Sequence, residues 1–170
     1  MRKGEDYLNC NDKSTLGENR STAETHFLEA LNILNDNHAD PAGFVKVYNG
    51  LMHVHLDLTF QSGLSIEERE EHLRTAMNYI SKCHEIAQNS PGGTGALAQV
   101  KLQEAVLYGR SVLLRAKRGK GARGTYLLER RDEAVERIEQ ALGELRDSNH
   151  RTKEKSIAWG KDFQDRLKRL

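Results

Sequence analysis

The amino-acid sequence predicts an all-α protein, built as a stack of about six helices in antiparallel pairs. Its composition, with 30% charged residues and two prolines among 170 residues, is typical of a helix-rich chain long enough to bury a core. Signals that begin and end helices recur from residue 21 onward. The only sustained alternation of polar and apolar residues is "LMHVHLDL", and a single strand would have no partner with which to pair.

Caps and breaks mark the helix boundaries. Ser21 and Glu24, and again Ser65 and Glu68, have the spacing of a capping box, in which a hydroxyl and a glutamate satisfy free backbone N–H groups at the start of a helix. The pair Asp40-Pro41 places proline where a helix can begin, and the stretches "SPGGT", "GKGARGT" and "DSNHRT" interrupt the remainder. These signals predict helices at 22–36, 41–61, 65–89, 94–118, 126–147 and 151–169.

Residues 1–20 are polar and lack periodicity, so we expect a flexible N-terminal arm before a helical domain that spans residues 21–170. The arm lacks the apolar core of a signal peptide, and no apolar run is long enough to cross a bilayer. Cys10 and Cys83 are isolated and lack metal-type spacing, which predicts free thiols in a reducing compartment. Together these features predict a cytoplasmic protein, with the nucleus as an alternative, and no membrane partner.

The stretch "NGLMHVHLDL", residues 49–58, carries His53 and His55 two positions apart. A similar His-x-His on a barrel strand binds a metal in amidohydrolases, but a barrel of that kind needs many strands and more than about 200 residues. Apolar residues from 42 to 60 also follow a spacing of three and four, in two stripes, which predicts a helix packed on two sides. On a helix, residues two apart point about 200° from each other, so the two imidazoles cannot share a metal. We therefore expect no metal site, with His53 on a polar face and His55 partly buried against a neighbouring helix.

A short pattern recurs on alternate predicted helices. The pattern begins with a large apolar residue and has alanine three positions later, directly followed by leucine or methionine. An aliphatic residue follows three positions after that. The pattern occurs at 27–34, 73–80 and 138–145. The other three helices each carry an interior glycine, at Gly50, Gly109 and Gly160. Glycine inside a helix costs about 1 kcal/mol relative to alanine, so these glycines predict places where neighbouring helices approach closely. Glycines placed by chance are the alternative.

The motif Ala23-x-x-x-Phe27-x-x-Ala30 matches the second-helix motif of a tetratricopeptide repeat, and Trp159-Gly160-x-x-Phe163 looks like the first-helix motif. The sequence thus resembles the tetratricopeptide repeat (TPR) family over residues 22–170. Its second-helix motifs recur at intervals of 46 and 65 residues instead of the family's 34, which indicates lengthened helices. The resemblance implies a right-handed, TPR-like stack of antiparallel helix pairs, whose concave face binds a peptide or helix of a partner protein.

On this basis we expect a non-catalytic interaction module, an adaptor or scaffold, with no cofactor. Polar residues at helical spacing on the second and fourth predicted helices would line its concave face, because such side chains hold a peptide backbone or carboxylate well. The expected partner-binding residues are Lys46, Asn49, His53, Lys101, Glu104, Tyr108 and Arg115. The same residue types also describe a solvated helix face, as does the charged cluster "EEREEH". No combination of nucleophile, base and orienting group stands out, so no catalytic residue is expected.

An uneven distribution of charge supports a second hypothesis. Residues 1–114 contain 10 basic and 15 acidic side chains, whereas residues 115–170 contain 16 and 10. Five cations between Arg115 and Arg123 meet no acid, so the basic region 115–131 is a candidate for contacting nucleic acid, although its glycines also suit a solvated loop. A helical enzyme or ligand-binding domain, with a site between helices, is the third hypothesis. A second copy of the chain is a further candidate partner, since an uncapped helical array can pair with itself.

Overall fold

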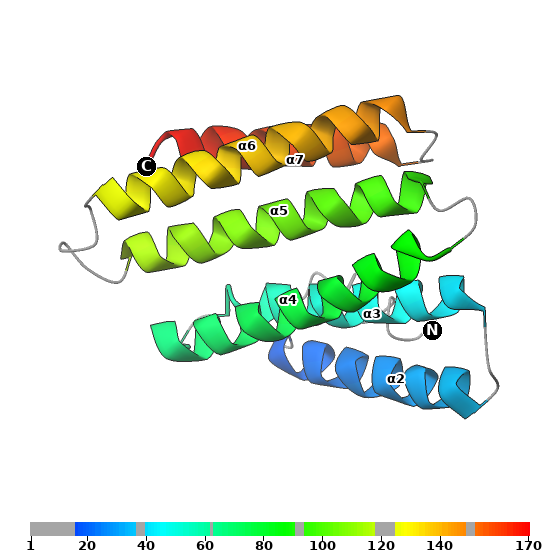
Figure 1. Cartoon of the computed structure of the whole chain (residues 1–170). Helices are drawn as coiled ribbons and strands as arrows, with labels where there is room; N and C mark the ends of the chain where they lie inside the picture. The colour runs from blue at the N-terminus through cyan, green and yellow to red at the C-terminus, as the bar shows by residue number, and fades with distance from the viewer. Residues whose placement is uncertain (1–15, 37–39, 62, 91–93, 118–124, 149–151) are drawn as a thin grey trace. The chain divides into compact units, whose positions relative to one another are not determined.

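The computed structural model describes residues 16–36, 40–61, 63–90, 94–117, 125–148 and 152–170. These residues form six α-helices and no strand, which confirms the all-α prediction (Figure 1). The helices are α2 (Leu16–Asp36), α3 (Pro41–Leu58), α4 (Ile66–Gln88), α5 (Thr94–Lys117), α6 (Thr125–Asp147) and α7 (Lys153–Lys168). The chain divides into two compact units, Met1–Ala87 and Gln88–Leu170, and each is described separately. No helix among the described residues is both long and apolar enough to pass through a membrane.

Two helix starts form as the sequence predicts. At the start of α4, the Ser65 backbone N–H donates to Oε2 of Glu68 at 2.7 Å, and the Glu68 backbone N–H donates to Oγ of Ser65 at 3.2 Å. At the start of α3, the Asp40 carboxylate accepts a hydrogen bond from the Ala42 backbone N–H, and Pro41 takes the first helical position. Both caps satisfy backbone donors that the helix itself leaves without a partner.

Helix α2 starts at Leu16, six residues earlier than predicted. The prediction of a capping box at Ser21 is therefore wrong, because Ser21 lies inside the helix. The helix extends upstream because Arg20 is buried and its guanidinium lies 2.9 Å from the Asp57 carboxylate on α3, which anchors this turn. Part of the predicted arm thus belongs to α2, and the remainder, residues 1–15, lies outside the described residues.

In the first unit, α3 contacts both α2 and α4, and successive helices run antiparallel. The Phe27 ring of α2 lies against Gly50 of α3. From the other side, the thiol of Cys83 on α4 donates to the Val45 carbonyl of α3 at 3.5 Å. The core of this unit contains Ala23, Phe27, Val47, Leu51 and Val54. Helix α3 is thus packed on two sides, as its apolar stripes predict, and Cys83 is a buried thiol, while Cys10 lies outside the described residues.

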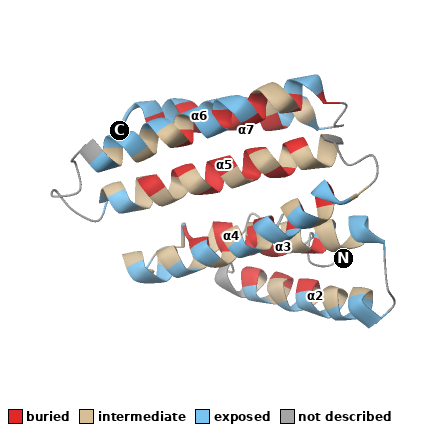
Figure 2. Cartoon of the chain, in the orientation of Figure 1, coloured by how far each residue is buried: buried red, intermediate tan, exposed pale blue. Residues whose placement is uncertain are grey.

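The second unit consists of α5, α6 and α7, with α6 antiparallel to both of the others. Buried residues recur along α5 (Figure 2), because it contacts both α6 and α7. The core of this unit includes Leu102, Val106, Ile138, Leu142, Leu145, Phe163 and Leu167. The apolar pattern at 138–145 supplies three of these positions, so the recurring pattern does mark a packed helix face.

The three interior glycines lie at close helix crossings, as predicted. A Cβ atom on Gly50 would lie 2.4 Å from the Phe27 ring of α2. A Cβ atom on Gly109 would lie 2.8 Å from the Phe163 ring of α7, and one on Gly160 would lie 3.0 Å from leucine side chains of α5 and α6. At each place a neighbouring side chain lies closer than an ordinary Cβ contact allows. Motif residues from both predicted repeat helices therefore take part in close packing, while the right-handed TPR-like stack stays a prediction.

Candidate functional site

A groove with charged rims lies on the surface of the second unit, between α5 and α6. It contains an open cavity of about 150 Å³. The residues that line it are Lys101, Glu104, Ala105, Arg137, Gln140, Ala141 and Glu144. On α5 the second and third of these residues follow the first by three and four positions, and on α6 the spacing from residue 137 to 140, 141 and 144 is likewise three, four and seven, so each set shares one face of its helix. We call this feature the α5–α6 groove.

The two helices give the groove a small apolar floor and charged rims. Ala105 and Ala141 are buried, and their short side chains leave room between the helices. The Lys101 ammonium lies 2.6 Å from Oε2 of Glu144, so an ion pair joins α5 to α6. These two side chains remain 35% and 34% exposed, so solvent screens the pair and its charges stay accessible to a ligand.

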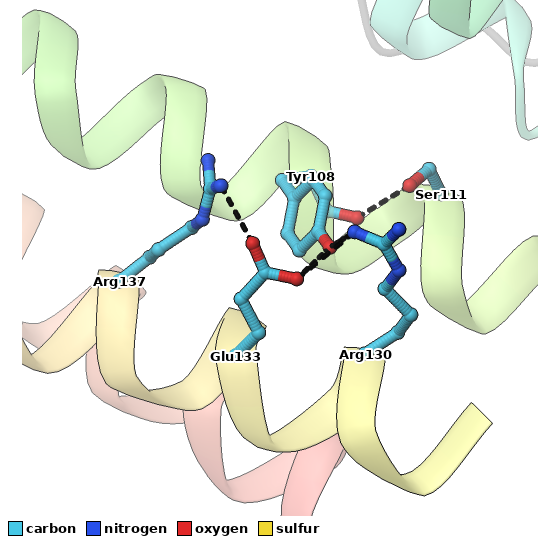
Figure 3. Close-up of polar contacts among 5 residues, drawn as sticks. All are labelled: Tyr108, Ser111, Arg130, Glu133 and Arg137. Carbon is cyan, nitrogen blue, oxygen red and sulfur yellow. Dashed lines mark hydrogen bonds and ion pairs between the residues drawn. The ribbon is translucent and has the colours of Figure 1, made fainter. Parts of the chain in front are cut away.

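Tyr108 lies beside the cavity on α5 and is the centre of a second polar network (Figure 3). Its hydroxyl donates to Oε2 of Glu133 at 2.5 Å and accepts a hydrogen bond from Nη1 of Arg130 at 3.0 Å. Arg137 donates to Oε1 of Glu133 at 2.6 Å, and its guanidinium lies 4.5 Å from the centroid of the Tyr108 ring. Figure 3 shows the three α6 side chains projecting towards Tyr108. Arg137 therefore links the network to the cavity that it also lines.

The Tyr108 network keeps its charges constant near neutral pH. Burial, followed by the hydrogen bond to Glu133, raises the pKa of the Tyr108 hydroxyl. The hydrogen bond from Tyr108, followed by the one from Arg137, lowers the pKa of Glu133. Tyr108 thus keeps its proton and Glu133 stays ionised, so this network presents a fixed pattern of charge.

Three of the four predicted partner-binding residues on α5 fall at or next to the groove. Lys101 and Glu104 line the cavity, and Tyr108 lies beside it. Arg115 is exposed in the last turn of α5 and is not among the lining residues. One wall of the groove was therefore predictable from the polar stripe on this helix.

The other wall, on α6, was missed. Its groups Glu133, Arg137, Gln140 and Glu144 also recur at a spacing of three and four, so the signal is present in the sequence. That spacing shows only that the four share a helix face. Which helix the face meets depends on how α5 and α6 pack.

The predicted residues on α3 belong to the first unit. Lys46 is exposed there, whereas Asn49 and His53 are partly buried. Since the two sets of residues lie in different units, the single concave face expected from both sets stays a prediction.

The helical interpretation of residues 49–58 is confirmed, since they lie in α3. His55 is buried more deeply than expected and contacts two neighbouring helices. Its Nε2 lies 3.2 Å from Oε1 of Glu24 on α2, and its Nδ1 lies 3.1 Å from Nδ1 of His72 on α4. The sequence does not single out His72, because the residue that it contacts, His55, belongs to a different helix. Among the described residues, no three His, Cys, Asp or Glu side chains are placed to hold a metal ion.

The basic region 115–131 is described only in part. Arg115 and Lys117 are exposed at the end of α5, and residues 118–124 lie outside the described residues. On α6, Arg130 and Arg131 lie 3.0 Å and 2.7 Å from acidic side chains. Nucleic-acid binding by this region therefore stays a hypothesis.

Comparisons of the chain with protein-family models, characterised proteins and solved structures found no match. The resemblance to tetratricopeptide repeats thus rests on the short motifs alone. The geometry of the α5–α6 groove is the basis for a functional proposal.

Proposed function

We propose that this chain is a non-catalytic interaction module, an adaptor or scaffold of TPR-like helix pairs, which binds a peptide or helix of a partner protein in the α5–α6 groove. The observation that supports this most directly is an open cavity with an alanine floor and rims that carry both signs of charge. A groove of this kind can receive one side chain of a partner and hold the neighbouring polar groups at its rims.

The size of the cavity favours a protein partner over a small molecule. Pockets for cofactors and drug-sized ligands usually enclose about 300–1,000 Å³. The cavity of the α5–α6 groove measures about 150 Å³ and is open to solvent. That volume suits one inserted side chain, with the rest of the partner spread over the surrounding helix surface.

The charges favour a protein partner over nucleic acid. Lys101 and Arg137 are cationic, Glu104 and Glu144 are anionic, and all four line the same cavity. Carboxylates repel a phosphate backbone, and nucleic-acid sites concentrate lysine and arginine on one surface. A peptide or helix that carries both signs of charge can complement this arrangement.

Reversing one cation of the groove is expected to weaken partner binding at least about tenfold, which corresponds to roughly 1.4 kcal/mol. Lys101→Glu places a carboxylate beside Glu144, and Arg137→Glu places one beside Glu133, so each variant repels the ligand group that the cation attracts. Affinity purification from native lysate with quantitative mass spectrometry identifies proteins that the wild type retains and both variants lose. Calorimetry with the identified protein then measures the change in affinity.

Lys161→Glu is the matched control, because Lys161 is an exposed lysine on α7 that lies outside the cavity lining. Far-UV circular dichroism should be the same for all three variants, which separates lost binding from lost helix. If both groove variants keep the wild-type partners and the wild-type affinity, the α5–α6 groove is not the binding surface.

A further inference from the structure

Three helices of the first unit meet at the imidazole of His55. This side chain belongs to α3, and the residue is only 8% exposed. Its Nε2 is 3.2 Å from Oε1 of Glu24 on α2, and its Nδ1 is 3.1 Å from Nδ1 of His72 on α4. The Tyr79 ring of α4 stacks on it, with the ring centroids 5.8 Å apart. The contacts of this one ring therefore depend on the positions of all three helices.

The two Nδ1 atoms can hold one proton between them, but not two. The carboxylate of Glu24 accepts hydrogen bonds, so Nε2 of His55 carries a proton. In neutral His55 the Nδ1 atom is then an acceptor, and His72 donates its Nδ1–H to it. The two ring centroids are 5.4 Å apart, so the nitrogens face each other close to the line of centres. This arrangement suits a shared proton better than two ligands converging on an ion.

We propose that the His55–His72 pair is a pH-sensitive latch between α3 and α4. With one proton between the Nδ1 atoms the latch is closed, and the pair can gain one further proton and keep this hydrogen bond. A second proton must enter at Nδ1 of His55, where it meets the N–H group of His72. That state loses the hydrogen bond and places two cations side by side, so α4 loosens from α3 at mildly acidic pH. The latch belongs to the first unit and does not depend on the α5–α6 groove.

The groups around the pair can balance one positive charge but not two. The titratable and charged side chains that surround it are Arg20 and Glu24 on α2, Tyr48 and Asp57 on α3, and Glu68, Tyr79 and Lys82 on α4. Arg20 neutralises Asp57 at 2.9 Å. Glu68 is engaged with Ser65 at the start of α4. Of these carboxylates, Glu24 is the one in direct contact with the imidazole pair.

Burial of His55 determines the direction of the pH effect. Burial, partly opposed by Glu24 and reinforced by His72, lowers the pKa of His55 from its ordinary value of 6.5. The unfolded chain therefore takes up this proton at a higher pH than the folded chain does. Between the lowered pKa and 6.5 the unfolded state binds more protons, so the stability of the first unit falls as the pH drops below 6.5.

Hydrogen–deuterium exchange of the full chain at pH 7.5 and pH 5.5 measures the opening directly. Carboxylates with ordinary pKa values near 4 stay ionised at both pH values. After correction for intrinsic exchange rates, amides in residues 51–56 and 69–76 should exchange about tenfold faster at pH 5.5. Amides of α6, a helix without histidine, should not change and provide the internal reference.

Three variants separate the latch from general acid sensitivity. His72→Gln removes one imidazole but keeps an amide that can donate to Nδ1 of His55 or accept from it, so the acid-induced rise should shrink to less than about threefold. Glu24→Gln keeps both imidazoles and removes the anion that favours a protonated His55, so the pKa of folded His55 falls further and the acid-induced rise should become larger than in the wild type. His26→Gln is the matched control on α2, where His26 pairs with Glu29 at the surface, and it should keep the wild-type response.

Equal acid responses of the wild type and His72→Gln would refute the latch, as would the absence of any rise at pH 5.5. If His72→Gln exchanges fast at both pH values, Glu24→Gln decides, and a rise at pH 5.5 no larger than that of the wild type refutes the latch. Adding zinc chloride at pH 7.5 tests whether the two imidazoles bind a metal ion instead of sharing a proton. Zinc-dependent protection of α3 and α4 that His72→Gln abolishes would show the nitrogens ligating an ion and overturn proton sharing, whereas no effect of zinc supports it.

Discussion

Replacing Gly50 with alanine is expected to lower the free energy of unfolding by about 2 kcal/mol, although alanine is the better helix former. The added Cβ atom would lie 2.4 Å from the Phe27 ring, which is fully buried on α2. A buried ring cannot swing aside as the end of a flexible chain can, so α2 and α3 must move apart. Overpacking of this kind costs up to about 3 kcal/mol, and the gain of about 1 kcal/mol in helix propensity offsets only part of it.

Gly143→Ala makes the same chemical change on α6 and is expected to have the opposite effect on the free energy of unfolding. Apart from its chain neighbours and the local helix backbone, no heavy atom lies within 4 Å of a Cβ atom built there, so helix propensity alone acts and stability should rise by up to about 1 kcal/mol. Urea denaturation of both variants measures the difference. In a Phe27→Leu background the penalty of Gly50→Ala should shrink, because the smaller side chain makes room. A penalty of unchanged size in that background would contradict the ring contact as its cause.

The crossing at Gly50 could be predicted because a glycine inside a helix has a known cost that close packing can offset. The separation of His53 and His55 could be predicted as well, because helical periodicity is a local property. The start of α2 could not. It depends on the contact between Arg20 and Asp57, which are far apart in the sequence and become neighbours only when α2 packs on α3.

The candidate site was predictable on one side only, for the same reason. Lys101, Glu104 and Tyr108 recur on one face of α5, and this pattern is visible before any packing is known. Their partners on α6 form an equally regular pattern, but charged residues at helical spacing look alike whether they face solvent or another helix. The pairing of Lys101 with Glu144 needs the relative placement of two helices, which no local pattern contains.

Arg69 shows how far a local interpretation of charge can mislead. It belongs to "EEREEH", which has the sequence features of an exposed face. In the structure its guanidinium reaches back to the turn that follows α3 and donates to three carbonyls. Nε bonds to Leu64 at 3.1 Å, Nη1 to Thr59 at 3.2 Å, and Nη2 to Gln61 at 3.0 Å. Carbonyl groups at and beyond the end of a helix lack helical partners, so this side chain holds the α3–α4 turn together.

Arg69→Ala is expected to lower the free energy of unfolding by about 3 kcal/mol. Hydrogen bonds to a charged group each contribute about 1.5–3 kcal/mol, and three are lost, although the more exposed carbonyls can turn to water. Arg69→Lys should recover less than half of the loss, because an ammonium group lacks the planar fork that reaches several carbonyls at once.

Arg74→Ala is the matched control on the same helix, and urea denaturation compares it with the two Arg69 variants. Arg74 is 66% exposed and pairs with Glu71 at the surface, so its removal should change stability by no more than about 0.5 kcal/mol. If Arg69→Ala and Arg74→Ala lowered the free energy of unfolding equally, helix propensity or net charge would explain the loss, and the hydrogen bonds to the α3–α4 turn would not. A graded series at position 69, with arginine above lysine and lysine above alanine, requires a forked donor, because loss of charge alone would leave lysine equal to arginine.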